Sequence, residues 1–184
     1  LVLKEEGFGD LLPGADAIVI DEAHQLPDVA AQFLGYSVST RQLAAISKDV
    51  AGELLLAQQM AGKVDGALGG LDAQIAAVLA LTGGQDARLE HAQWPDRLLE
   101  ALNGLGARAG ELADVIAPLG ADGQAAFKRL QERLEEIADR LHSLTAEEVP
   151  GGVRWAETSA RNVSAHFAPV DVASQLSSLM EPQP

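Results

Sequence analysis

Residues 127 to 144 read FKRLQERLEEIADRLHSL, and their apolar positions recur at alternating spacings of three and four residues. That spacing places an apolar side chain on the same face of a helix at every turn, with charged residues on either side. The seam consists of Phe127, Leu130, Leu134, Ile137, Leu141 and Leu144. Because a helix of this kind is stable mainly through packing against a partner, the stretch predicts a helical bundle.

The chain before this seam supplies the partner helices. Residues 39–42 have capping-box spacing and begin an amphipathic helix that we expect to close near Gly62. A third helix opens at Trp94-Pro95-Asp96 and carries its own apolar stripe, at Leu98, Leu102, Leu105, Ala109, Leu112 and Ile116. The turn expected around residues 118–123 is short, so this helix and the seam helix should form an antiparallel pair.

Between these helices the pattern is weaker. The stretch GKVDGALGG (62–70) is predicted to be a flexible break, because glycine disfavours helix. LDAQIAAVLALT (71–82) then forms a shorter helix, which Gly83-Gly84 stops.

Strand patterns lie near both ends of the chain. AIVI (17–20) is a continuous apolar run of the kind buried in parallel sheets, and GYSVS (35–39) is a second extended piece. Val153 and Trp155, then Val163, Ala165 and Phe167, alternate with polar neighbours around 159–162 and predict a hairpin. Asp171 is placed to cap a short helix over residues 172–180. The expected fold is mainly α, with an elongated helical section projecting from strand material at its two ends.

Composition limits the functions that the chain can have. It has 184 residues, 47% of them apolar, and 27 acidic against 13 basic residues give a net charge of -14. Such a surface repels phosphate backbones, so any DNA contact must be local. Without cysteine the chain forms no disulfide or thiolate metal site, which fits a reducing compartment. No membrane partner is expected from the short apolar runs, and a cytoplasmic location is predicted.

Two adjacent carboxylates follow the AIVI run. At the carboxyl end of a buried parallel strand, Asp21 is placed to hold a magnesium ion through water, and Glu22 to orient or deprotonate an attacking water. His24 is placed to report nucleotide state to another part of the protein. The alternative is a surface turn with two solvated acids and a hydrogen-bonded histidine. A His-Glu-x-x-His zinc site is absent from the sequence.

The chain lacks a phosphate-binding loop. Its only Gly-Lys pair, Gly62-Lys63, is followed by Val64, and Ala57 stands where the first glycine of the loop is required. If Asp21 and Glu22 belong to an ATPase, the loop lies before Leu1, and this chain alone is expected to be inactive.

The residues around the carboxylate pair resemble a known family. VIDEAHQLPDVA (19–30), with LKEEGFGDLLPGADA before it, resembles motif II of superfamily 2 DNA helicases of the XPD/DinG type, in particular the bacterial DinG-like branch. VRWAETSARNVSAHFAPVDVASQL (153–176) is similar to the stretch that follows their arch domain and re-enters the first motor domain. Between these two stretches the resemblance rests on helical character.

The resemblance implies an ATP-dependent DNA helicase, generally of 5' to 3' polarity, that acts in DNA repair or replication. It assigns residues 1–38 to the first RecA-like motor domain, 39–149 to a helical arch that frames single-stranded DNA, and 150–184 to the return into that motor domain. It also implies roles for Asp21 in holding magnesium, for Glu22 as catalytic base and for His24 in coupling. ATP and magnesium would bind in the parent protein, whose iron-sulfur cluster would lie upstream.

A second hypothesis is a non-catalytic acidic module whose helical bundle docks a protein partner. The arginines at 129, 133 and 140 share one helix face, but neighbouring acids favour intrahelical ion pairs over a DNA track. Trp94 and Trp155 are interpreted as core anchors and not as base-stacking platforms. A compromise also stands, in which the arch of a working helicase is itself a docking surface.

Overall fold

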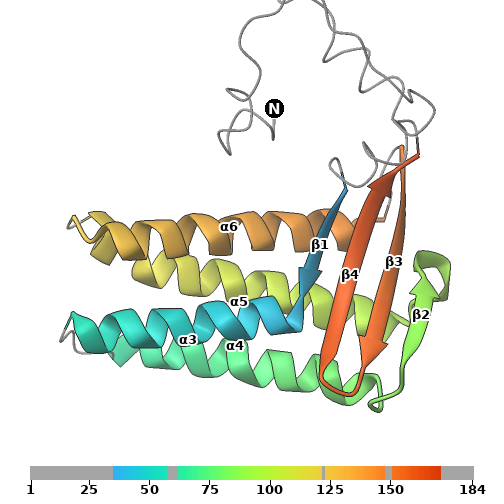
Figure 1. Ribbon diagram of the computed structural model, residues 1–184, viewed down its shortest axis with the longest axis horizontal. Helices are drawn as coiled ribbons and strands as arrows, with labels where there is room; N and C mark the ends of the chain where they lie inside the picture. Colours follow the sequence, from blue (N-terminus) through green and yellow to red (C-terminus); the bar gives the residue numbers. More distant parts are fainter. Residues whose placement is uncertain (1–34, 58–61, 122, 148–150, 171–184) are drawn as a thin grey trace, which may run out of the picture.

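A computed structural model describes residues 35–57, 62–121, 123–147 and 151–170. In this part of the chain four helices lie against a four-stranded antiparallel sheet, which crosses one end of the bundle (Figure 1). The helices are α3 (Thr40–Leu56), α4 (Gly62–Leu81), α5 (Asp96–Ala121) and α6 (Ala125–Thr145). The strands are β1 (Tyr36–Ser39), β2 (Ala87–Glu90), β3 (Gly152–Ser159) and β4 (Asn162–Pro169). The mainly α fold with a carboxyl-terminal hairpin is confirmed.

The seam predicted from residues 127–144 is the core of α6. All six of its apolar residues are buried, Leu134 and Leu144 completely. They pack against the apolar stripe of α5, whose six predicted residues are also buried. A Cβ atom on Gly106 would lie 3.3 Å from the Cβ of Leu141, so the absence of a side chain at this position allows the two helices to approach closely.

The predicted break at residues 62–70 is wrong, because α4 begins at Gly62 and runs without interruption to Leu81. Val64, Leu68 and Leu71 continue the buried face that Ile75 and Val78 form in its second half. Burial of this face outweighs the low helix propensity of glycine. The glycines at 62, 66 and 69 meet no tertiary neighbour within 4 Å of an added Cβ and take no part in the packing.

Two helix ends differ from expectation, and a third is as predicted. The first predicted helix, α3, ends at Leu56, and its expected N-cap is present, since the Ser39 hydroxyl accepts from the Gln42 amide. Helix α5 continues through Pro118 to Ala121, and the turn is made at Gly123, which has a φ of 89°. Gly83 and Gly84 end α4 as predicted, each with positive φ.

The sheet has the order β1-β4-β3-β2. Strands β3 and β4 form the predicted hairpin, with Ser159 opposite Asn162, and β1 pairs with β4. Strand β2 was not predicted; it comes from within the helical section and pairs with β3. The apolar alternation noted in β3 does not match its burial, since Ala156 is buried, whereas Val153 is 51% exposed.

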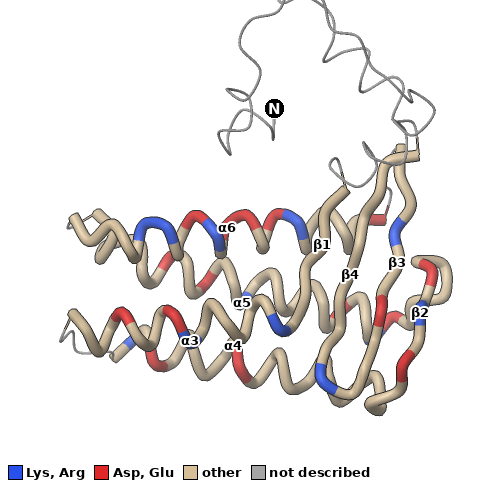
Figure 2. Tube along the Cα trace, in the orientation of Figure 1, with Lys and Arg blue, Asp and Glu red and all other residues tan. Residues whose placement is uncertain are grey.

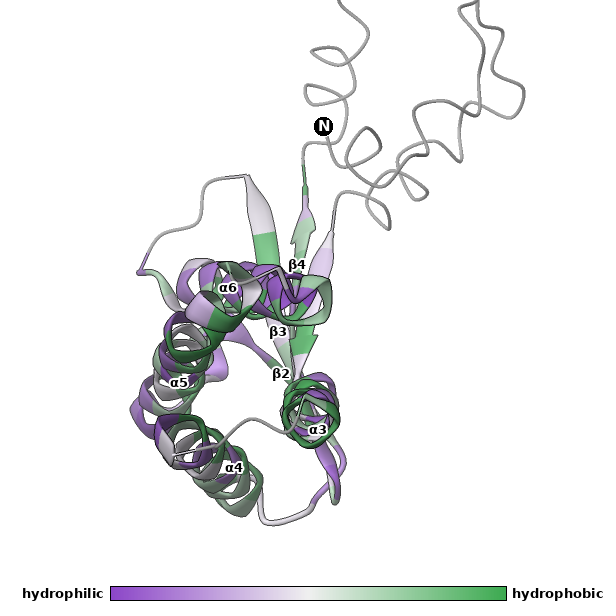
Figure 3. Cartoon of the chain, turned by 90° about the vertical axis from the view of Figure 1, so that its left-hand side faces the viewer, coloured by the Kyte–Doolittle hydropathy of each residue, from purple (hydrophilic) through white to green (hydrophobic). Residues whose placement is uncertain are grey.

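One hydrophobic core joins the sheet to the bundle. Val38, Ala156, Val163 and Ala165 belong to the same buried cluster as the helix residues. Seen along the helices, α6, α5 and α4 follow one another in an arc with α3 opposite (Figure 3). The expected domain limits at 38/39 and 149/150 stay predictions.

Helix α4 is long and apolar enough to cross a membrane by length and composition alone, the one such helix in the described ranges. Core helices of proteins outside membranes pass the same test. Its larger apolar side chains are buried against the bundle, and its exposed positions are mostly Gly and Ala.

Candidate functional surfaces

The predicted nucleotide site lies outside the described residues. This holds for Asp21, Glu22 and His24, for the strand expected at 17–20 and for the helix expected at 172–180. Their roles stay predictions. Among the described residues, no group of three or more His, Asp or Glu side chains is arranged to hold a metal ion.

An arginine fixes the end of the bundle to the sheet. The Arg154 guanidinium, on β3, donates to the carbonyl oxygens of Leu144 and Ala146, at 2.9 and 2.5 Å. Both carbonyls belong to the carboxyl end of α6, where unpaired carbonyls and the helix dipole favour a cation. Desolvation by burial lowers the pKa of Arg154, but an arginine stays charged. We call this contact the Arg154 clamp.

His91 contacts the guanidinium of the Arg154 clamp. Its Nδ1 lies 3.3 Å from Arg154 Nη2, so the neutral tautomer with hydrogen on Nε2 can accept from the guanidinium. Burial, and then the charge of Arg154, lower the pKa of His91. Its Nε2 is buried without a partner among the described residues. A shallow pocket of about 460 Å³ adjoins the Arg154 clamp.

The open face of the sheet carries a stack of side chains. The Trp155 and His166 rings are nearly parallel, with centroids 4.9 Å apart, and Arg88 lies over Trp155 at 4.7 Å. Glu157 accepts from the Trp155 indole at 3.1 Å and lies 3.7 Å from His166 Nε2. Burial lowers the pKa of His166; Glu157 raises it and Arg88 lowers it, each less strongly. Because His166 and Arg88 already pack on the indole, Trp155 is better explained as a packed side chain than as a platform for a nucleic-acid base.

The two tryptophans therefore differ. Trp94 is 5% exposed and its indole donates to the Leu89 carbonyl at 3.1 Å, as a core anchor does. The interpretation as a core anchor is wrong for Trp155, which is only partly buried and faces away from the bundle.

Charges of both signs alternate along α6 (Figure 2). Arg140 pairs with Glu136 and Lys128 with Glu132 within the helix, as expected. Arg133 instead reaches Asp49 of α3 at 3.6 Å. It lines a groove of about 410 Å³ between α3 and α6, together with Arg129 and Lys48.

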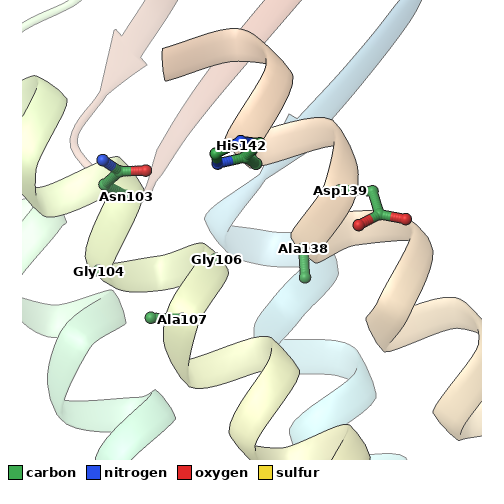
Figure 4. Close-up of a pocket in the computed structure, with 7 residues that line it drawn as sticks. All are labelled: Asn103, Gly104, Gly106, Ala107, Ala138, Asp139 and His142. Atoms are coloured by element: carbon green, nitrogen blue, oxygen red, sulfur yellow. The ribbon is translucent and has the colours of Figure 1, made fainter. Parts of the chain in front are cut away.

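A second groove of about 570 Å³ lies between α5 and α6 (Figure 4). Gly104, Gly106 and Ala107 line it on α5, and His142 points toward Asn103 across it. Small residues account for its shape, and among its lining residues no nucleophile is paired with a base.

The negative charge is concentrated outside the described residues. Twelve of the 13 Lys and Arg residues are described, but only 16 of the 27 Asp and Glu residues. The bundle and sheet are therefore much closer to neutral than the net charge of -14 indicates.

Neither the Arg154 clamp nor the stack around Trp155 was predicted. No local pattern reveals that Arg154 meets the end of α6. The stack could have been inferred only from the register of the predicted hairpin, because pairing Ser159 with Asn162 places Trp155 opposite His166.

No protein-family model matches the chain. It is nevertheless homologous to ATP-dependent DNA helicases over its whole length.

One relative is the ATP-dependent DNA helicase YoaA of Escherichia coli, which is 33% identical over 198 residues and aligns with 100% of this chain. The protein of the same name from Haemophilus influenzae is 30% identical over 190 residues and aligns with 98% of the chain. In both cases the chain spans 29% of the relative's length.

Proposed function

We propose that the chain is a segment of an ATP-dependent DNA helicase, carrying motif II of the first motor domain and the helical arch. The observation that carries this proposal is the alignment of essentially the whole chain with the two YoaA helicases. The bundle adds support, because it extends away from the sheet at which the chain enters and leaves (Figure 1).

In this proposal Asp21 holds magnesium through water, Glu22 activates the attacking water, and His24 couples hydrolysis to strand movement. Phosphate loop, iron-sulfur domain and second motor domain belong to other parts of the parent protein. That protein moves 5' to 3' along single-stranded DNA in repair or replication, in the cytoplasm and away from membranes. The bundle, as the arch, helps to frame the opening for the strand.

The test is made in the full-length protein. Glu22→Gln should abolish DNA-stimulated ATP hydrolysis while ATP binding persists, because the amide preserves shape but cannot act as a base. Glu100→Gln, the same change at an exposed position of α5, is the matched control. Retained turnover in the Glu22 variant would refute the assigned role.

The competing function is a non-catalytic module that docks a protein partner through the bundle. The observation that favours it is the basic groove between α3 and α6. The parent gene separates the two possibilities. A reading frame that lacks a Gly-Lys-Ser/Thr loop upstream, or a second motor domain downstream, supports the docking module alone.

A further inference from the structure

The groove between α3 and α6 is lined by both apolar and basic residues. The apolar part of its lining consists of Gly52 and Leu56 on α3 and of Ala126 and Leu130 on α6. Leu130 is 6% exposed, but Leu56 is 79% exposed, and Leu55 beside it is 81% exposed. Leu56 lines the groove, so burial of its exposed side chain against apolar residues of a partner would be favourable.

Three cations stand along the same groove. Lys48 belongs to α3, and Arg129 and Arg133 to α6, and all three are exposed. The Arg133 guanidinium lies 3.6 Å from the Asp49 carboxylate. Both side chains are about half exposed, so the ion pair between them is weak. Among the described residues Arg129 makes no ion pair, so carboxylates of a partner would find it available.

The occupant must match both features at once. An amphipathic helix does so when leucine-type side chains on one face enter the groove and acidic residues beside them meet the cations. We propose that this groove docks an acidic amphipathic helix of a partner protein. The inference goes beyond the helicase proposal and does not depend on it.

Single-stranded DNA fits the groove less well. A strand needs aromatic surfaces for its bases, and none of the residues that line the groove is aromatic. Asp49 and Glu53 also stand on the α3 side, where a strand's evenly spaced phosphates would meet them. A helix can place its carboxylates opposite the cations only.

The experiment uses the full-length protein as bait for a display library of random 16-residue peptides. We expect enrichment of sequences with leucine-type residues at spacings of three and four and with Asp or Glu beside them. A labelled copy of the most enriched peptide is then titrated by fluorescence anisotropy. Arg129→Glu with Arg133→Glu should weaken binding about tenfold or more, and so should Leu56→Asp.

Arg97→Glu makes one such charge reversal on the exposed surface of α5 and should leave the affinity unchanged, whereas Arg129→Glu alone should weaken it. Circular dichroism verifies that each variant is folded, and Lys48→Glu replaces any that is not. The proposal is overturned if no peptide is enriched, if the enriched peptides lack acidic residues, or if the groove variants bind equally well. It is also overturned if oligothymidine binds the wild type and loses affinity in the same variants. DNA-stimulated ATP hydrolysis, measured separately, tests the helicase proposal independently.

Discussion

Replacing Arg154 by Met should release the end of α6 from the sheet. The side chain keeps most of its length but loses both hydrogen bonds to the carbonyls of Leu144 and Ala146. A charged donor contributes about 1.5–3 kcal/mol per hydrogen bond, and the helix dipole adds about 0.3–1 kcal/mol. Because water can reach part of this site, we expect the free energy of unfolding to fall by about 3 kcal/mol.

Urea denaturation followed by circular dichroism measures the change. Arg154→Lys should recover only about half of the loss, because an ammonium group cannot span two carbonyls as a guanidinium does. Arg97→Met, on the exposed side of α5, should change the free energy of unfolding by less than about 0.5 kcal/mol. If the Met variant at 154 is equally small in effect, or if Lys replaces Arg fully, the Arg154 clamp does not stabilise the fold.

Three further results are expected. The pKa values of His91 and His166 are lowered in the folded chain, so the unfolded chain binds protons more readily at these positions. The folded state is therefore most favoured above a pH of about 6.5 and loses this stability as the pH falls. Urea midpoints that do not change between pH 7 and 5 would contradict this. Leu134→Ala should lower the free energy of unfolding by about 2–5 kcal/mol, and a loss below about 1 kcal/mol would show that the seam is loosely packed. Gly106→Leu should lower the free energy of unfolding by about 1–3 kcal/mol, because the new side chain collides with α6. Gly110→Ala should raise it by about 0.5–1 kcal/mol, because an added Cβ there meets open space. Equal shifts of the two melting curves would refute the close approach of the helices.

Local periodicity predicted the parts of the fold that depend on a single helix or turn. The seam of α6, the stripe of α5 and the hairpin turn at 159–162 each carry their signal in consecutive residues. The first half of α4 was missed because its glycines obscure a buried face that only the rest of the bundle reveals. Helix propensity alone could not decide this case.

Strand β2 and the orientation of β3 depend on contacts distant in sequence. Ala87–Glu90 has four residues and a single partly buried one, and it becomes a strand only by pairing with β3. In β3 the small residues Ala156 and Thr158 are buried on the side of the bundle, and the larger Trp155 lies on the other face of the sheet. Side-chain hydrophobicity predicted the opposite.

The candidate surfaces also differ in whether a local sequence pattern indicates them. Asp21, Glu22 and His24 were found from a short motif after an apolar run, and their placement stays a prediction. The basic groove needs two helices side by side, and the Arg154 clamp needs a strand to meet a helix end. Both depend on contacts between separate elements of the fold, which the local pattern of a single sequence does not show.

Hydrogen bonds and a shared core join the bundle to the sheet. The Thr40 hydroxyl at the start of α3 lies 3.1 Å from Asn162 Oδ1 and accepts from the Val163 amide at the same distance. The Arg154 clamp ties the end of α6 to the same hairpin, and β2 closes the sheet from within the helical section. The chain enters at Tyr36 opposite Phe167, so the entering and leaving strands are neighbours. In the proposed helicase, a movement of the motor at these strands would therefore reach the bundle through these contacts.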